Sequence, residues 1–167
     1  SRDNADAREE SFSVLDKLVY WGFSKKSERK IDTIVLHSTY NALGGDPFSV
    51  SKIIDIYKSY GVSPHYLLAR DGTVYRLVKE TNIAYHAGES QMKDGRDNVN
   101  DFSIGIEIIG KADGNPTDEQ YVSLQELIAD IKSRYDIKHV LGHSDIASGR
   151  KTDPWGFDWG EIHGKKL

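Results

Sequence analysis

Two histidines and one glutamate stand at positions where a polar side chain is unusual. His37 ends one run of apolar residues, Glu107 lies inside a second, and His143 follows a third. A carboxylate inside an apolar strand is costly unless it is paired, protonated or next to a metal. The three residues therefore indicate a site at one edge of a sheet. Each also has a structural alternative, a hydrogen-bonded core histidine or a buried ion pair.

The loop that follows His143 adds further groups that can take part in hydrolysis. Asp145, Lys151 and Asp153 lie within ten residues of it. Two neutral imidazoles and one carboxylate form a ligand set that suits zinc and leaves a fourth position for water. The chain contains no cysteine, so a metal site has to use histidines and carboxylates. Spacing alone does not identify the ligands, because no short pattern such as His-Glu-x-x-His occurs.

Hydrophobic patterning predicts the elements that must position these groups. Runs of apolar and β-branched residues predict three buried strands, 31–37, 103–109 and 138–141. The Asp71-Gly72 pair predicts a hairpin between two further strands. Ser49 and Thr117 each precede apolar residues at helical spacing and are typical helix caps. The intermixed strands and helices predict an α/β fold, a single domain with a mixed central β-sheet flanked by helices.

The length of 167 residues also favours one domain. We assign this domain to residues 30–167, and residues 1–29 to an N-terminal tail and short helix. Residues 1–11 are polar and charged, which is typical of a terminus or linker. Apolar residues recur at helical spacing between Phe12 and Val19, and this spacing predicts the short helix.

The composition excludes several classes of protein. The chain carries 22 basic and 26 acidic residues, a formal net charge of −4, without a dense basic stretch. This balance argues against a nucleic-acid partner. No apolar run approaches the ~20 residues that a membrane span requires. We expect a monomer without a nucleic-acid partner and without a membrane span.

Five segments of the chain together carry a family resemblance. They are Thr33–Ser38, Val62–Gly72, Ala84–Gly88, Asn100–Glu107, and Gly142–Ala147 running on to Lys151–Pro154. In this order they resemble the zinc-dependent N-acetylmuramoyl-L-alanine amidases of the type-2 class, which are related to peptidoglycan recognition proteins. The resemblance implies the fold of that family and a Zn²⁺ cofactor.

The resemblance also implies roles for individual residues. His37, His143 and Asp153 would hold the zinc ion. Glu107 would be the base that activates the attacking water, and Lys151 would face the developing oxyanion. In phage relatives a catalytic tyrosine precedes the histidine of the hairpin, whereas this chain has a proline there, so the base role falls to Glu107 alone.

Two further residues are candidates for substrate binding. His86 and Asn100 lie in matching segments, and we expect His86 to line the groove that holds the muramyl or peptide portion. A structural contact within the loop is its alternative. His65, in contrast, opens the hairpin and is expected to be structural. An arginine that contacts the peptide's diamino acid in some bacterial relatives is Asn98 here, which leaves the stem-peptide preference open.

The activity implied by the resemblance is hydrolysis of the amide between N-acetylmuramic acid and L-alanine in peptidoglycan. Two alternatives remain, a peptidoglycan-binding module of the same fold and a zinc peptidase that acts within the stem peptide. A binder could lose any ligand freely, so the complete set favours the enzyme. We expect a location in the cell envelope or outside the cell, where peptidoglycan lies. A cytoplasmic recycling enzyme that acts on soluble muropeptides is the alternative.

Overall fold

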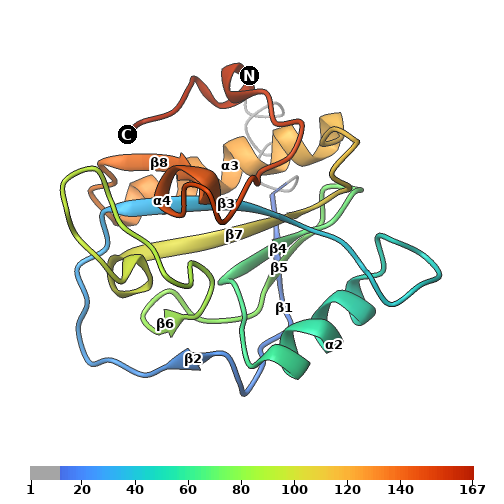
Figure 1. Cartoon of the computed structure of the whole chain (residues 1–167), viewed down its shortest axis with the longest axis horizontal. Helices are drawn as coiled ribbons and strands as arrows, with labels where there is room; N and C mark the ends of the chain where they lie inside the picture. The colour runs from blue at the N-terminus through green and yellow to red at the C-terminus, as the bar shows by residue number, and fades with distance from the viewer. Residues whose placement is uncertain (1–11) are drawn as a thin grey trace, which may run out of the picture.

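A six-stranded mixed sheet forms the centre of the protein (Figure 1). The computed structural model describes residues 12–167. The strands lie in the order β1-β5-β4-β7-β3-β8, and all neighbours are parallel except β4 and β5. Their bounds are β1 Val14–Asp16, β3 Thr33–Thr39, β4 Tyr66–Leu68, β5 Val74–Arg76, β7 Ser103–Ile109 and β8 His139–Gly142. A separate antiparallel pair joins β2 (Phe23–Ser24) to β6 (Ile83–Ala84).

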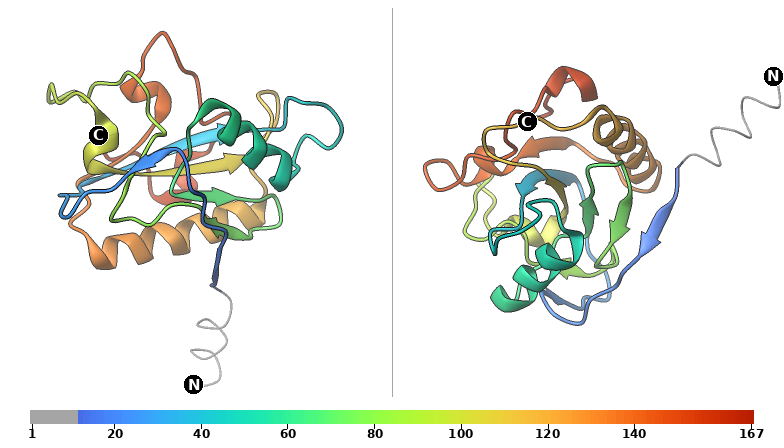
Figure 2. Two further views of the ribbon diagram at one scale, coloured as in Figure 1. Left: turned by 90° about the horizontal axis from the view of Figure 1, so that it is seen from below. Right: turned by 90° about the vertical axis from the view of Figure 1, so that its right-hand side faces the viewer.

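Two helices cover the two faces of the central sheet. The left view of Figure 2 shows α3 (Asp118–Arg134) on one face and α2 (Val50–Tyr60) on the other. Shorter helical turns are η1 (Val99–Phe102), α4 (His143–Ile146) and η2 (Trp159–Ile162). Within residues 12–167, no helix has the length and apolar character needed to cross a membrane. The predicted α/β fold, with a mixed central sheet flanked by helices, is confirmed.

Local sequence signals explain where both long helices begin. The Ser49 hydroxyl accepts a hydrogen bond from the backbone N–H of Lys52 at the start of α2. The Thr117 hydroxyl accepts one from the backbone N–H of Gln120, whose side chain accepts one from Thr117 N in return. This reciprocal capping box satisfies N–H groups that the first helical turn leaves unpaired. α2 ends at Gly61, which has the left-handed φ of 65°.

Alternate side chains of β3 and β7 point either into the apolar core or towards the candidate site. Ile34 and Leu36 of β3, with Ile106 of β7, pack in the apolar cluster that includes α3. Successive strand residues point to opposite faces. His37 and Glu107 therefore point to the other face of the sheet, the face that α2 covers.

The predicted short helix between residues 12 and 19 is wrong. This segment contains the edge strand β1, which pairs in parallel with β5. The pairing continues in hydrogen bonds from Lys17 N to Arg76 O and from Val19 N to Leu77 O. A helix this short is marginal by itself, whereas the open edge of β5 offers unpaired backbone groups. The predicted tail or linker over residues 1–11 lies outside the described residues.

Candidate active site

Three neighbouring parallel strands bring three of the predicted residues to one edge of the sheet. β3 lies between β7 and β8, and His37 pairs in register with Glu107. β8 ends at Gly142, which pairs with Leu36 of β3. His143 follows at once and begins α4. The register of the sheet therefore places both histidines and the glutamate at the carboxyl ends of adjoining strands.

Backbone contacts hold Asp153 against the end of β3. The backbone N–H of Ser38 donates a hydrogen bond of 3.1 Å to Asp153 Oδ2. Ser144 N donates one to the carbonyl of Asp153 at 3.0 Å, and Trp155 N donates one to Ser38 Oγ at 2.9 Å. The loop after α4 thus folds back, and its carboxylate reaches the two histidines.

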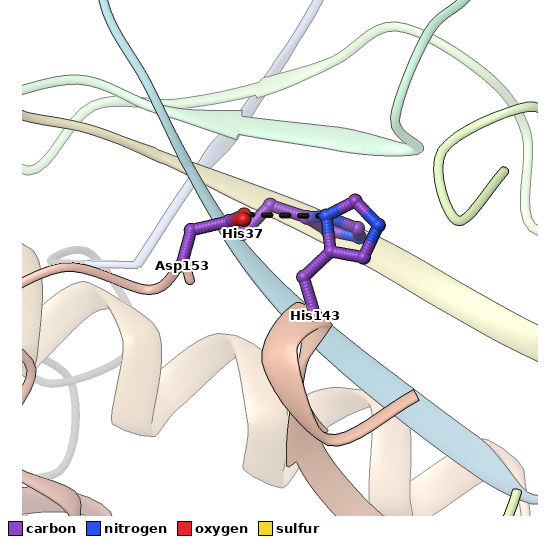
Figure 3. Close-up of side chains that lie close together, drawn as sticks. All are labelled: His37, His143 and Asp153. Atoms are coloured by element: carbon purple, nitrogen blue, oxygen red, sulfur yellow. Dashed lines mark hydrogen bonds and ion pairs between the residues drawn. The ribbon is translucent and has the colours of Figure 1, made fainter. Parts of the chain in front are cut away.

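His37, His143 and Asp153 form a buried group that could hold a metal ion (Figure 3). The Nδ1 atoms of the two histidines are 2.9 Å apart. Asp153 Oδ2 lies 3.7 Å from His37 Nδ1 and 3.4 Å from His143 Nδ1. Ligand atoms ~2.0–2.1 Å from a tetrahedral zinc ion lie about 3.3 Å from one another. The three side chains therefore fit such an ion without large rearrangement.

The hydrogen bonds of the opposite ring nitrogens also fit a metal site. His143 Nε2 donates to the carbonyl oxygen of Ala87 at 2.9 Å, so its Nδ1 carries a lone pair when the ring is neutral. His37 Nε2 lies 2.9 Å from His86 Nδ1, and His86 Nε2 lies 3.0 Å from Ser103 Oγ. Burial, with His143 close by, holds the pKa of His37 well below its ordinary value. Neutral imidazoles fixed through their second nitrogen are the form that binds metals.

Glu107 and Lys151 line the same cleft as the three ligands. The pKa of Glu107 is raised to about 8, chiefly by burial; Tyr57 opposes this shift, Asp153 adds to it, and Lys151 opposes it. The carboxyl group is therefore poised to exchange a proton near neutral pH. Lys151 is exposed to solvent and places a cation at the cleft.

The cleft has a volume of 670 Å³, which suits a small organic ligand. All seven residues that the sequence predicts for the site line it: His37, His86, Asn100, Glu107, His143, Lys151 and Asp153. Five aromatic residues that sequence reasoning missed line it as well: Tyr40, Tyr57, Tyr60, Tyr85 and Trp155. Scattered over four segments of the chain, they form no pattern in the sequence.

The two predicted substrate-binding residues make contacts that hold neighbouring parts of the site in place. Asn100 Oδ1 accepts hydrogen bonds from the backbone N–H groups of His86 and Ala87, so it fixes this loop. The His86 ring contacts His37 and Ser103 through its two nitrogens. Binding of substrate by His86 and Asn100 stays a prediction.

His65 is fully buried outside the cleft, and its contacts agree with the structural role expected for it. Its Nδ1 accepts a hydrogen bond from Gly105 N, and its Nε2 lies near Arg29 and the carbonyl of Asn82. Burial and the nearby Arg29 cation lower its pKa to about 3.

Gly105 is a further residue that sequence reasoning missed. It pairs with Val35 in the middle of the sheet and lies directly against the His86 ring. A Cβ atom at this position would lie 2.3 Å from His86 Cγ, closer than side chains can approach. Its only signal in the sequence is a glycine inside an apolar strand, which marks close approach of another group.

The fold and the site together define a class: an α/β protein with a candidate hydrolytic metal centre at the carboxyl edge of its sheet. The family described as N-acetylmuramoyl-L-alanine amidase matches residues 27–156. The chain belongs to this family, which confirms the resemblance predicted from the sequence.

Curated relatives agree with this family. The chain is 45% identical over 100 residues to the 1,6-anhydro-N-acetylmuramyl-L-alanine amidase AmpD of Enterobacter cloacae, covering 58% of this chain and 53% of the relative. It is 46% identical over 101 residues to AmpD of Escherichia coli, covering 59% of this chain and 55% of the relative. The chain thus spans about half the length of the curated relatives it matches.

Solved structures share the fold. A selenomethionine derivative of AmpD superposes with a TM-score of 0.75 at 30% identity, covering 92% of this chain and 95% of that one. AmiD of Escherichia coli, in a complex with anhydro-N-acetylmuramic acid-L-Ala-D-γ-Glu-L-Lys, superposes with a TM-score of 0.71 at 27% identity. The match covers 84% of this chain and 64% of AmiD. The peptidoglycan recognition protein PGRP-Hd of Alvinella pompejana shares the fold alone, with a TM-score of 0.60 at 16% identity and coverage of 83% and 90%.

Proposed function

We propose that this chain hydrolyses the amide bond between N-acetylmuramic acid and L-alanine, with a zinc ion held by His37, His143 and Asp153. The observation that carries the proposal is the convergence of these three ligand atoms in one cleft with Glu107 and Lys151. Membership of the amidase family supports the same reaction.

The charges of His37 and Asp153 suit a divalent metal ion. The buried His37 ring is neutral, and Asp153 supplies one negative charge that the backbone N–H of Ser38 stabilises. A zinc ion held by His37, His143 and Asp153 would polarise a carbonyl and lower the pKa of water. The protein residues around it then have to move protons and to stabilise charge.

Glu107 is placed to move the proton. Its carboxylate takes a proton from the attacking water and returns it to the departing amine of L-alanine. A pKa raised by burial makes the carboxylate a stronger base, and a zinc ion bound nearby would favour its ionised form. One side chain can therefore act as base and then as acid.

Lys151 is placed to stabilise the charge of the transition state. Its ammonium group carries a permanent donor and positive charge into the cleft. In the tetrahedral intermediate the carbonyl oxygen becomes an oxyanion, and a donor aimed at it contributes mainly to kcat. Of the other lining groups, Tyr40 and Trp155 form an aromatic pair that offers apolar surface to a sugar or peptide.

We propose a soluble anhydromuropeptide as the first substrate. The AmpD relatives are named for a 1,6-anhydro muramyl substrate. A structure of AmpDH3 of Pseudomonas aeruginosa is a complex with anhydromuramic pentapeptide. The location of the chain, in the cell envelope or in the cytoplasm, stays a prediction. The substrate decides between the compartments, because intact peptidoglycan lies outside the cytoplasmic membrane whereas recycling acts on soluble fragments.

Mass spectrometry of the reaction products tests the proposal. The purified chain is incubated with an anhydromuropeptide and, separately, with intact sacculi, before and after zinc is removed by a chelator and returned. We expect release of the complete stem peptide that depends on zinc. Cleavage within the stem would support the peptidase, and binding without any cleavage would support the binding module.

A further inference from the structure

The hydroxyl of Tyr57 is buried at the cleft without a partner. Tyr57 belongs to α2, is 5% exposed and packs in the apolar cluster that contains Ile53, Leu67 and Ile109. Its Oη atom has no hydrogen-bond partner within the described residues 12–167. A buried hydroxyl without a partner destabilises the fold. A phenylalanine would fill the same space without this cost, so packing does not explain the hydroxyl.

The surroundings of the hydroxyl indicate what it serves. Tyr57 lines the cleft together with Glu107 and Thr39. Besides burial, the Glu107 carboxylate is the group that most strongly raises the pKa of Tyr57, and Tyr57 in turn lowers the pKa of Glu107. Tyr57 shares its apolar cluster with Leu67, which pairs in register with Glu107. The two side chains therefore line the same part of the cleft, one with an O–H donor and the other with a carboxylate acceptor.

We propose that Tyr57 is a positioning residue whose hydroxyl donates a hydrogen bond to the Glu107 carboxylate and holds it towards the attacking water. The inference rests on the proposed function, in which Glu107 is the base. A glutamate side chain on a strand has several rotatable bonds, and a fixed donor reduces the orientations that its carboxylate adopts. Tyr57 is suited to this task because α2 holds its backbone and the apolar cluster around its ring fixes the side chain.

Kinetics of Tyr57→Phe, which removes only the oxygen atom, test the proposal. We expect kcat to fall about 10–100-fold, as is typical when a supporting partner of an active-site group is lost. We expect KM to stay within about twofold, because the hydroxyl acts on the base and not on the bound substrate. Zinc content and the thermal midpoint should not fall. Tyr75→Phe is the matched control, since Tyr75 packs against the same cluster but does not line the cleft.

A double-mutant cycle with Glu107→Gln separates positioning from other roles. If Tyr57 acts through Glu107, Tyr57→Phe should cause no further loss in the Glu107→Gln background. Product detection by mass spectrometry after long incubation makes the slow variants measurable. An equal loss in both backgrounds, a raised KM at unchanged kcat, or loss of zinc would overturn the proposal, as would wild-type rates in Tyr57→Phe. An inactive wild-type chain would instead refute the proposed function itself, and the positioning role with it.

Discussion

Replacement of Gly105 by alanine should lower the affinity of the proposed metal site, because the new methyl group displaces His86, which contacts His37. The new Cβ would lie 2.3 Å from His86 Cγ and 2.6 Å from its Cδ2 and Nδ1 atoms. Carbon atoms in contact are about 3.5–4.0 Å apart, so the ring must move by about 1 Å or more. Its Nδ1 lies only 2.9 Å from His37 Nε2, and hydrogen bonds weaken beyond about 3.2 Å. The alanine should therefore displace the group that fixes the ring of His37, a proposed metal ligand.

Two quantities should change in Gly105→Ala. The crowded interior should lower the free energy of unfolding by about 1–3 kcal/mol. Zinc affinity should fall about 10–100-fold, because His37 loses the partner of its second nitrogen. Competition with a chromophoric chelator measures the affinity, and urea unfolding of the zinc-free protein measures the stability.

Gly110→Ala is the matched control. Gly110 directly follows β7, and a Cβ atom there would meet only the flexible end of Arg70, at 3.3 Å. In a His86→Ala background the new methyl group has free space, so Gly105→Ala should lose its effect there. If Gly105→Ala bound zinc as tightly as Gly110→Ala, the support of His37 by His86 would be refuted.

Four further predictions follow from the site and its surroundings. His143→Ala should lose both bound zinc and activity, and metal analysis that still finds one zinc per chain would contradict the ligand assignment. Glu107→Gln is nearly isosteric and should fold and keep zinc while turnover falls about 10²–10⁴-fold; wild-type rates would remove Glu107 as the base. Lys151→Met should lower kcat about 10²–10³-fold with less effect on KM, and unchanged rates would leave Lys151 as a surface charge. Burial lowers the pKa of His65 to about 3, so only the unfolded state gains a proton at this residue as the pH falls below about 6.5, and each pH unit lowers the free energy of unfolding by about 1.4 kcal/mol. Urea unfolding at pH 7 and at pH 5.5 should show a smaller loss of stability in His65→Gln than in the wild-type chain. An equal loss in both would contradict this prediction.

Much of the fold could be predicted from local signals. The two long buried strands, β3 and β7, show themselves as continuous apolar runs, and both long helices begin at the predicted caps, Ser49 and Thr117. These signals are reliable because capping and burial depend on residues close in sequence. The edge strand β1 could not be predicted this way, since its structure depends on pairing with β5, about 60 residues further along the chain.

The candidate site, like the fold, depends partly on residue type and partly on the tertiary structure. The sequence by itself determined the chemical groups: two histidines, two carboxylates and a lysine, in an order that identifies the family. Only the tertiary structure decided that His37 and Glu107 share one face, that Asp153 folds back onto Ser38, and that α2 buries a tyrosine hydroxyl near Glu107. The reason is physical. Residue type sets what a side chain can donate, accept or bind, whereas strand register and loop closure set the distances between groups far apart in the chain.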